Sequence, residues 1–195
     1  MRAVRRAAAG RAGILLLAAW LFLSPGPARA WNTGSGVYFK IGADGFRPTA
    51  SSMKSRYGDF WGGGGEIGVR LWKSVDLWLA GHYAEKSGAL PVTGEGSKIV
   101  LTSIGGGLRL RLPAGPACFY AGGGPLFLVY KETNSIGLAR GTKPGFVALA
   151  GVSLRLLGGL FLDVDAEYSS VVVKPKTIQA DLGGLTLGLR LGFLF

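Results

Sequence analysis

Charged side chains recur at alternate positions inside apolar segments of this sequence, and they are the residues best placed to do chemistry. Near residue 68, for example, Glu66 and Arg70 alternate with Ile67 and Val69. A strand presents every second side chain on the same face, so these charges share one face of a sheet. The charged residues with this placement are Glu66, Arg70, Asp76, Arg109, Arg111, Arg155, Asp163, Asp165, Glu167 and Arg190. Five carboxylates against five guanidinium groups predict a network of ion pairs, because a buried charge is costly unless it is paired.

The same charges admit two other interpretations. A narrow, gated conductance path would also place charges of both signs along an interior. Asp163, Asp165 and Glu167 suggest a site for a hard cation, which takes several oxygen ligands. These carboxylates project from one face of one strand, where the arginines should neutralise them. We therefore expect neither a metal ion nor a cofactor.

Eight segments have the alternation or the apolar content of β-strands. They are Gly36–Ala43, Phe60–Trp72, Val75–Glu85, Ile99–Leu112, Ala117–Tyr130, Phe146–Leu156, Leu160–Ser169 and Leu182–Phe195. Most have about the 9–11 residues that a tilted strand needs to cross a bilayer. Short connections (73–74, 113–116 and 157–159) alternate with long ones (44–59, 86–98, 131–145 and 170–181). This rhythm predicts an all-β fold, an eight-stranded antiparallel up-and-down barrel with its short turns on one side.

The alternation also assigns most of the faces. Leu77, Leu108 and Leu162 face outward, whereas Trp78 and the charged residues face inward. A basic residue that faces lipid near the midplane costs about 2–4 kcal/mol, and this assignment avoids that cost. The fifth segment is apolar on both sides, so its faces stay unassigned. Eight strands enclose an interior just wide enough for side chains, which excludes a large pore.

The first thirty residues have the features of a secretory signal peptide. Arginines precede an apolar core at Gly13–Leu23, and Ala28-Arg29-Ala30 forms an A-x-A cleavage site. The core is shorter than the roughly 20 residues of a spanning helix. We expect a signal peptide at residues 1–30 and one barrel domain at 31–195, with an uncleaved anchor as the alternative.

Part of the basic charge belongs to this leader. The formal net charge is +11, but five of the 22 basic residues and none of the 11 acids precede Trp31, which leaves +6 for the rest. Nucleic acid is therefore not an expected partner. Cys118 is the only cysteine, so no internal disulfide can form.

Glycine is abundant, with 34 residues in 195 against a usual share of about 7%. Its clusters at 62–65, 105–107, 122–124 and 183–184 lie inside predicted strands, where glycine marks bulges, bends and close approach. We interpret them as devices for the curvature of a narrow barrel. Residues 63–68 match G-x-G-x-x-G, but that dinucleotide motif must open a helix, whereas here a strand pattern continues.

The last eleven residues alternate strictly and stop on a phenylalanine, with Leu189, Leu191, Phe193 and Phe195 on the outer face. This terminal strand resembles the assembly signal of bacterial outer-membrane β-barrel proteins. Together with the leader and the eight-strand rhythm, it makes residues 31–195 similar to the small outer-membrane β-barrel family of Gram-negative bacteria, which includes OmpA-, OmpX- and OmpW-like barrels. The resemblance implies a location in the cell outer membrane.

The resemblance also implies partners and a range of functions. The partners are outer-membrane lipid, lipopolysaccharide and the barrel assembly machinery, and the protein is expected to be a monomer. Functions in the family extend from anchoring and adhesion to transport of small apolar compounds, and the fold does not choose among them. We expect a structural or surface-interaction role without enzymatic activity. A narrow channel for small or hydrophobic solutes is the alternative.

His82, the only histidine, bears on an enzymatic alternative. Some eight-stranded outer-membrane enzymes modify lipid A with a His/Ser site, and the deacylase type has a His-x-Ser arrangement. Here Tyr83-Ala84 follows His82, although Ser87 or Ser103 can approach it in space. Because a nucleophile needs a base within hydrogen-bond reach, we expect a packed or interfacial histidine instead.

Basic residues gather in the predicted long loops. The candidates for anion contacts there are Lys54, Arg56, Lys131, Arg140, Lys143, Lys174 and Lys176. Lys and Arg make charge-assisted contacts to phosphate, so we expect these residues to contact lipopolysaccharide headgroups, with a merely solvated surface as the alternative. A soluble lipocalin-like barrel is the alternative fold, but it would put the charges on the wrong face.

Overall fold

A computed structural model describes residues 36–89, 94–135, 137–173 and 180–195. The predicted signal peptide lies outside these ranges, as do Lys174 and Lys176. Within the described ranges, no helix is both long enough and apolar enough to cross a membrane.

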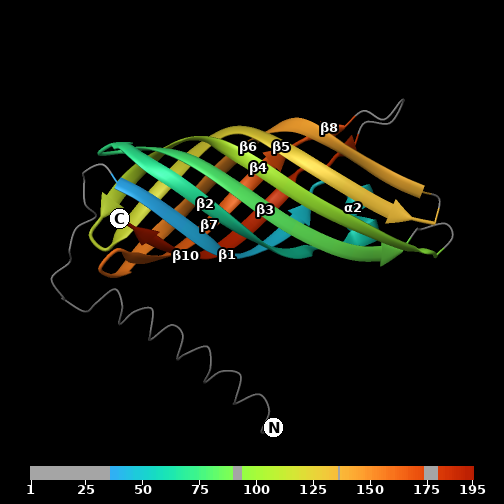
Figure 1. Cartoon of the computed structure of the whole chain (residues 1–195), viewed down its shortest axis with the longest axis horizontal. Helices are drawn as coiled ribbons and strands as arrows, with labels where there is room; N and C mark the ends of the chain where they lie inside the picture. The colour runs from blue at the N-terminus through green and yellow to red at the C-terminus, as the bar shows by residue number, and fades with distance from the viewer. Residues whose placement is uncertain (1–35, 90–93, 136, 174–179) are drawn as a thin grey trace, which may run out of the picture.

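Eight antiparallel strands close into a barrel, in which each strand pairs with its sequence neighbours and the last pairs with the first (Figure 1). The strands are β1 (Gly36–Pro48), β2 (Phe60–Trp72), β3 (Val75–Ala89), β4 (Gly96–Ala114), β5 (Ala117–Asn134), β6 (Gly137–Leu157), β7 (Leu160–Ser170) and β10 (Gly184–Leu194). Outside the barrel, β8 (Val172–Val173) pairs with β9 (Ala180–Asp181). The predicted eight-stranded antiparallel barrel is confirmed.

Tight turns join the strands at one end of the barrel. Residues 73–74, Gly115-Pro116 and Gly158-Gly159 make these connections, and Gly115 and Gly158 adopt φ angles of 60° and 58°. Glycine adopts such positive angles without a steric penalty. The short helix α2 (Ser51–Tyr57) lies at the opposite end (Figure 1).

The strands run further than predicted at the α2 end. β5 and β6 stay paired as far as Asn134 and Gly137, and β3 and β4 as far as Ala89 and Gly96. Most of residues 131–145 are therefore a continuous hairpin, not the predicted loop. These extensions carry polar side chains on both faces, so alternation could not reveal them, and main-chain pairing holds them together. Lys131, Arg140 and Lys143 consequently lie on strands.

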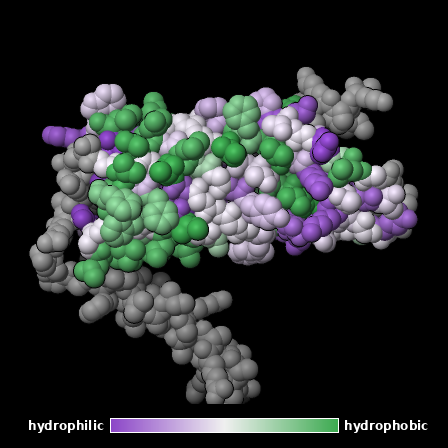
Figure 2. Space-filling model, viewed as in Figure 1, coloured by the Kyte–Doolittle hydropathy of each residue, from purple (hydrophilic) through white to green (hydrophobic). Residues whose placement is uncertain are grey.

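Large apolar side chains cover the outside of the barrel. Ile67, Leu79, Leu108 and Leu189 are each between 52% and 56% exposed. On the face seen in Figure 2, hydrophobic residues extend from the short-turn end across the middle, and hydrophilic ones gather toward α2. A soluble monomer rarely exposes a contiguous apolar patch of this extent, whereas a membrane barrel presents such a band to lipid.

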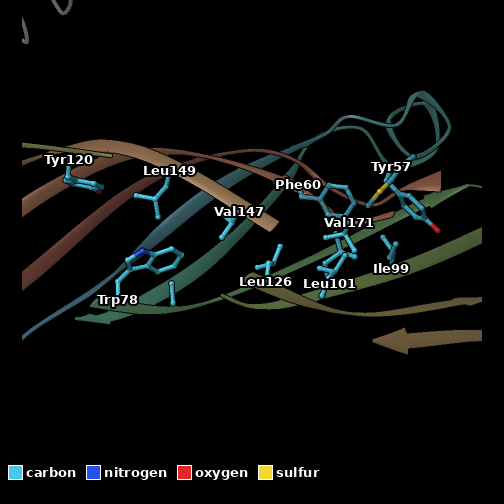
Figure 3. Close-up of a cluster of buried hydrophobic side chains, with 13 residues drawn as sticks. Tyr57, Phe60, Trp78, Ile99, Leu101, Tyr120, Leu126, Val147, Leu149 and Val171 are labelled. Atoms are coloured by element: carbon cyan, nitrogen blue, oxygen red, sulfur yellow. The ribbon is translucent and has the colours of Figure 1, made fainter. Parts of the chain in front are cut away.

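The interior changes character along the axis. Toward α2 it is filled by apolar side chains, among them Leu101, Leu126, Leu128 and Val147 (Figure 3). Leu126 and Leu128 settle the orientation of the fifth strand, because Phe119 and Phe127 of β5 face outward. Toward the short turns the interior is charged.

Candidate functional site: a charged network in the barrel lumen

The first group of charged residues lies closest to the short turns and is called the short-turn tier; it comprises Arg70, Asp76, Arg111 and Arg155. Arg111 Nε lies 2.5 Å from Asp76 Oδ1, and its Nη2 donates to the carbonyls of residues 72 and 73, both at 3.3 Å. Arg70 is buried and stands opposite Asp76 in the β2–β3 register. Arg155 donates through Nε to the carbonyl of Gly158, 2.9 Å away at the turn. Asp76 thus pairs with Arg111 and stands opposite Arg70, while Arg155 binds the neighbouring turn.

The next group, the middle tier, is built around Lys40 and comprises Lys40, Glu66, Arg109, Tyr120, Ser153 and Asp163. Lys40 Nζ lies 3.0 Å from Glu66 and 3.0 Å from Asp163. Asp163 also accepts hydrogen bonds from the hydroxyls of Tyr120, at 2.7 Å, and Ser153. The Asp163 carboxylate, which is fully buried, is therefore compensated by one cation and two hydroxyls.

Arg109 ties the middle tier to the short-turn tier. Its guanidinium pairs with Glu66 and lies 3.4 Å from Asp76. It also lies over the rings of Tyr38 and Tyr120, 5.0 and 4.6 Å from their centroids. Cation–π contacts of this kind gain strength when they are desolvated. Two carboxylates and two rings therefore hold Arg109 in place.

The third group, the outer tier, lies furthest from the short turns and comprises Asp44, His82, Asp165, Glu167 and Arg190. Arg190 pairs with Asp165, with Asp44 at 2.8 Å and with Glu167 at 3.1 Å. His82 bridges two of the same carboxylates, with Nδ1 2.9 Å from Asp44 and Nε2 3.3 Å from Glu167. Strands β1, β3, β7 and β10 contribute these side chains, so the cluster spans the lumen.

Glycine makes room for these side chains. A Cβ built on Gly188 would overlap the Asp165 carboxylate, and one on Gly68 would overlap the Tyr38 hydroxyl. A Cβ on outward-facing Gly81 would instead meet its nearest atom at 3.7 Å, an ordinary contact. Inward glycines in this barrel therefore provide space for the lumen network, a role that the prediction of curvature alone did not include.

The structure brings most of the ten predicted lumen residues together. Eight of them form ion pairs, namely Glu66, Asp76, Arg109, Arg111, Asp163, Asp165, Glu167 and Arg190. Asp163 pairs with Lys40, not with an arginine. The described contacts of Arg70 and Arg155 are those of the short-turn tier.

Sequence reasoning missed Lys40 and Asp44. The faces predicted from alternation do not include Lys40, and the predicted connection 44–59 contains Asp44, yet both residues are buried in the lumen, at 2% and 4% exposure. The signal was present, because Tyr38, Lys40 and Asp44 continue one parity of an alternation whose other parity includes Phe39 and Ile41. Ending the first strand at residue 43 hid it.

His82 is fixed by carboxylates on both sides. Each ring nitrogen contacts a carboxylate oxygen, so neither is turned toward a serine. Ser103 stands opposite His82 in the β3–β4 register, but the contacts of His82 are with Asp44 and Glu167. Across the part of the chain that the structure describes, no three His, Cys, Asp or Glu residues are grouped to hold a metal ion.

The predicted anion-contact residues divide between the two faces of the wall. Lys131 and Arg140 stand directly opposite one another on the outward face of the β5–β6 hairpin, and both are exposed. Lys143 pairs in register with inward-facing Leu128 and so lies on the inner face. Two further candidates are on α2, and Arg56 there is bound to Glu132 at 2.8 Å while Lys54 is exposed.

The four residues of the predicted assembly signal point outward, from the middle of β10 to its short-turn end. Leu189, Leu191, Phe193 and Phe195 are all exposed, and the rings of the two phenylalanines meet edge to face with centroids 5.0 Å apart. They form the apolar outer face of the strand that closes the barrel onto β1.

Comparison with known proteins identifies the fold. No protein-family model matches the sequence, and no curated protein matches it. Among solved structures, OprG from Pseudomonas aeruginosa is similar with a TM-score of 0.63 and 10% identity over 84% of this chain and 97% of that chain. Ail from Yersinia pestis, in complex with the heparin analogue sucrose octasulfate, is similar with a TM-score of 0.57 and 14% identity over 83% of this chain and 99% of that chain. Neisserial surface protein A is similar with a TM-score of 0.56 and 17% identity over 83% of this chain and 97% of that chain.

These neighbours are bacterial outer-membrane and surface proteins. The chain therefore has the fold of the small eight-stranded outer-membrane barrels, as the sequence resemblance implied. An apolar outside and a charged inside complete the description of a transmembrane β-barrel.

Proposed function

We propose that this protein is an integral outer-membrane barrel with a structural or surface-interaction role, held in place through contacts with lipopolysaccharide phosphates. Its lumen is plugged by ion pairs, and it acts as a monomer without enzymatic activity. Outer-membrane lipid surrounds it, and its C-terminal strand engages the barrel assembly machinery.

The observation that carries the proposal is the pair formed by Lys131 and Arg140. Like charges directly opposite on neighbouring strands are destabilising unless an anion lies between them. Lys98, on the neighbouring strand, has an acidic partner in Glu85 at 2.7 Å. Within the described residues, neither member of the Lys131–Arg140 pair has a carboxylate in ion-pair range. Phosphate would supply the missing charge.

The position of this pair fits the headgroup region. Lys131 lies four residues beyond Phe127 on the same outward face of β5, which is about 13 Å along a strand. Phe127 and Phe146 are exposed on this face, and Tyr83 and Tyr168 are exposed outward toward the same end. Aromatic girdles mark the boundary between hydrocarbon and headgroups, so cations just beyond them meet lipid phosphates.

Ail supports the proposal as an analogy of fold. That protein forms a complex with sucrose octasulfate, a polyanion, so a protein of similar fold can bind a polyanion. The cations of this chain itself support the proposal, because the likeness to Ail extends to the fold alone.

The test is binding of the detergent-folded protein to immobilised lipopolysaccharide. Neutralising both cations, as Lys131→Gln with Arg140→Gln, should weaken binding about tenfold, a change of about 1.4 kcal/mol. The difference should vanish when the lipid A phosphates have been removed. Lys73→Gln, at the opposite end of the barrel, is the matched control. Equal binding by the double variant and the parent protein would contradict the proposal.

A further inference from the structure

A cavity lies inside the barrel between the outer tier and the apolar cluster beneath α2. Its walls include Leu101, Leu126, Leu128, Val147 and Val171, each at most 6% exposed (Figure 3). The centre of a water-sized sphere can occupy about 60 Å³ of it. This is several times the roughly 10–15 Å³ that one water requires. The space therefore has room for a small organic group.

The floor of the cavity is polar and rich in hydrogen-bond acceptors. Asp44, His82 and Glu167 line it. Asp44 directs one carboxylate oxygen to Arg190 and the other to His82, and Glu167 does the same. Each carboxylate oxygen has more than one acceptor position, so both groups can still accept a donor from the cavity.

The outer tier, which supplies this floor, also has more acidic than basic side chains. Among the described residues, the outer tier has three carboxylates, and its bases are Arg190 and His82. By formal charge, with each carboxylate counted as ionised and the imidazole as charged, one negative charge is left over. Lys40 in the middle tier is paired with Glu66 and Asp163. An added positive charge would balance this formal excess beside the buried Asp44 and Glu167, where unpaired charge is costly.

We propose that this cavity is a binding site for a small organic cation, with an apolar body of about one ring and a single primary ammonium group. The ammonium group lies against Asp44 and Glu167, and the body lies against the leucine and valine walls. An organic acid is excluded by the charge of the floor. A bare metal ion would lose hydration against apolar walls, and neutral hydrocarbon would leave the floor uncompensated.

Isothermal titration of the full chain, folded in detergent, tests this site with benzylammonium as the probe. Benzyl alcohol and benzoate have nearly the same body with a neutral and a negative head. At neutral pH we expect one benzylammonium per barrel, at least tenfold weaker binding of benzyl alcohol and no binding of benzoate. Equal affinity for the three probes, or no binding of benzylammonium, would overturn the proposal.

Three variants locate the binding. Val147→Phe fills the cavity and should abolish binding, whereas Leu187→Phe enlarges a side chain exposed on the outer face and should leave it unchanged. Glu167→Gln keeps one acceptor oxygen for Arg190 and turns an amide NH2 donor toward the His82 ring nitrogen, but it removes a charge, so it should weaken benzylammonium at least tenfold and benzyl alcohol little. Heat-modifiable migration on a gel establishes that each variant is folded, and Leu101→Phe replaces Val147→Phe if the latter is not. Persistent binding in a folded cavity-filling variant would refute the site, since the probe would then be in the micelle.

Discussion

Arg190 contacts three carboxylates from two strands and is 1% exposed. Replacing it by Met would leave Asp44, Asp165 and Glu167 together with only His82 to compensate them. Breaking a buried pair in this way costs about 3–5 kcal/mol. We expect a loss of that size in urea unfolding of the detergent-folded protein, followed by tryptophan fluorescence. Arg47→Met is the control, because its 3.9 Å contact with Asp59 is exposed and should contribute under about 0.5 kcal/mol.

Gly188 occupies the space beneath the same cluster. In Gly188→Ala, the new methyl group must displace the Asp165 carboxylate or the Arg190 side chain. Overpacking of this kind costs about 1–3 kcal/mol. Gly81→Ala adds the same methyl group on the outer face, where it meets nothing closer than 3.7 Å, and should change stability little. Similar unfolding curves for the two variants would mean that the lumen can accommodate a methyl group at position 188 without loss of stability.

Prediction from sequence worked at the residue scale wherever a strand's alternation was strict. The placements of Arg109, Asp165 and Arg190 follow from parity alone. The partners do not, because pairing across a barrel depends on register and tilt. Asp163 binds Lys40 from a strand that is two positions away around the wall, a contact that no local pattern encodes.

Helix α2 is fastened across the outer end of the barrel by polar contacts. The Tyr57 hydroxyl lies 2.6 Å from Ser97 Oγ on β4 and donates to Glu132 on β5 at 2.8 Å, while Arg56 binds the same carboxylate at 2.8 Å. Burial raises the pKa of the Tyr57 hydroxyl, so it stays a proton donor well into the alkaline range. Met53, Tyr57 and Phe60 belong to the buried apolar cluster beneath the helix.

Loosening this fastening should expose α2 to protease. In Tyr57→Phe the two hydroxyl contacts are lost while the ring remains, so trypsin should cut after Lys54 and Arg56 several times faster than in the parent protein. Time-resolved mass spectrometry of the digest measures the rates. Ser55→Ala removes an exposed hydroxyl bonded only within the helix, to the Ser52 carbonyl, and should leave cleavage unchanged. Equal rates in both variants would show that the hydroxyl does not hold the helix.

Strand number and order were predictable, but the extent of the elements was not. Alternation marks a strand only where one face meets lipid and the other meets the lumen. Beyond the hydrocarbon, Lys131 and Arg140 on one face of the β5–β6 hairpin follow no apolar stripe, and the pairing continues through main-chain hydrogen bonds. α2 was also missed, since seven residues are too few to show a helical period.

At the scale of the whole barrel, the interior is filled by side chains whose chemical character changes from one end to the other. Three charged tiers fill the part nearest the short turns, and an apolar cluster with one cavity fills the part below α2. In planar bilayers we therefore expect the parent protein to show no stable conductance steps at moderate voltage. Discrete steps of constant size would contradict a plugged lumen and favour the alternative of a narrow channel. A folded population, seen by heat-modifiable migration, must accompany a silent recording.

The contacts across the lumen also bear on how the cylinder is made. β1 and β10 meet at the seam where the sheet closes on itself. Asp44 on β1 pairs with Arg190 on β10, and Lys40 on β1 reaches past β10 to Asp163 on β7. A sheet still open at this seam would turn both members of these pairs toward acyl chains, where each is expensive. Partly closed forms of the barrel are therefore unfavourable in the membrane. Insertion into the bilayer must coincide with the pairing of β1 and β10.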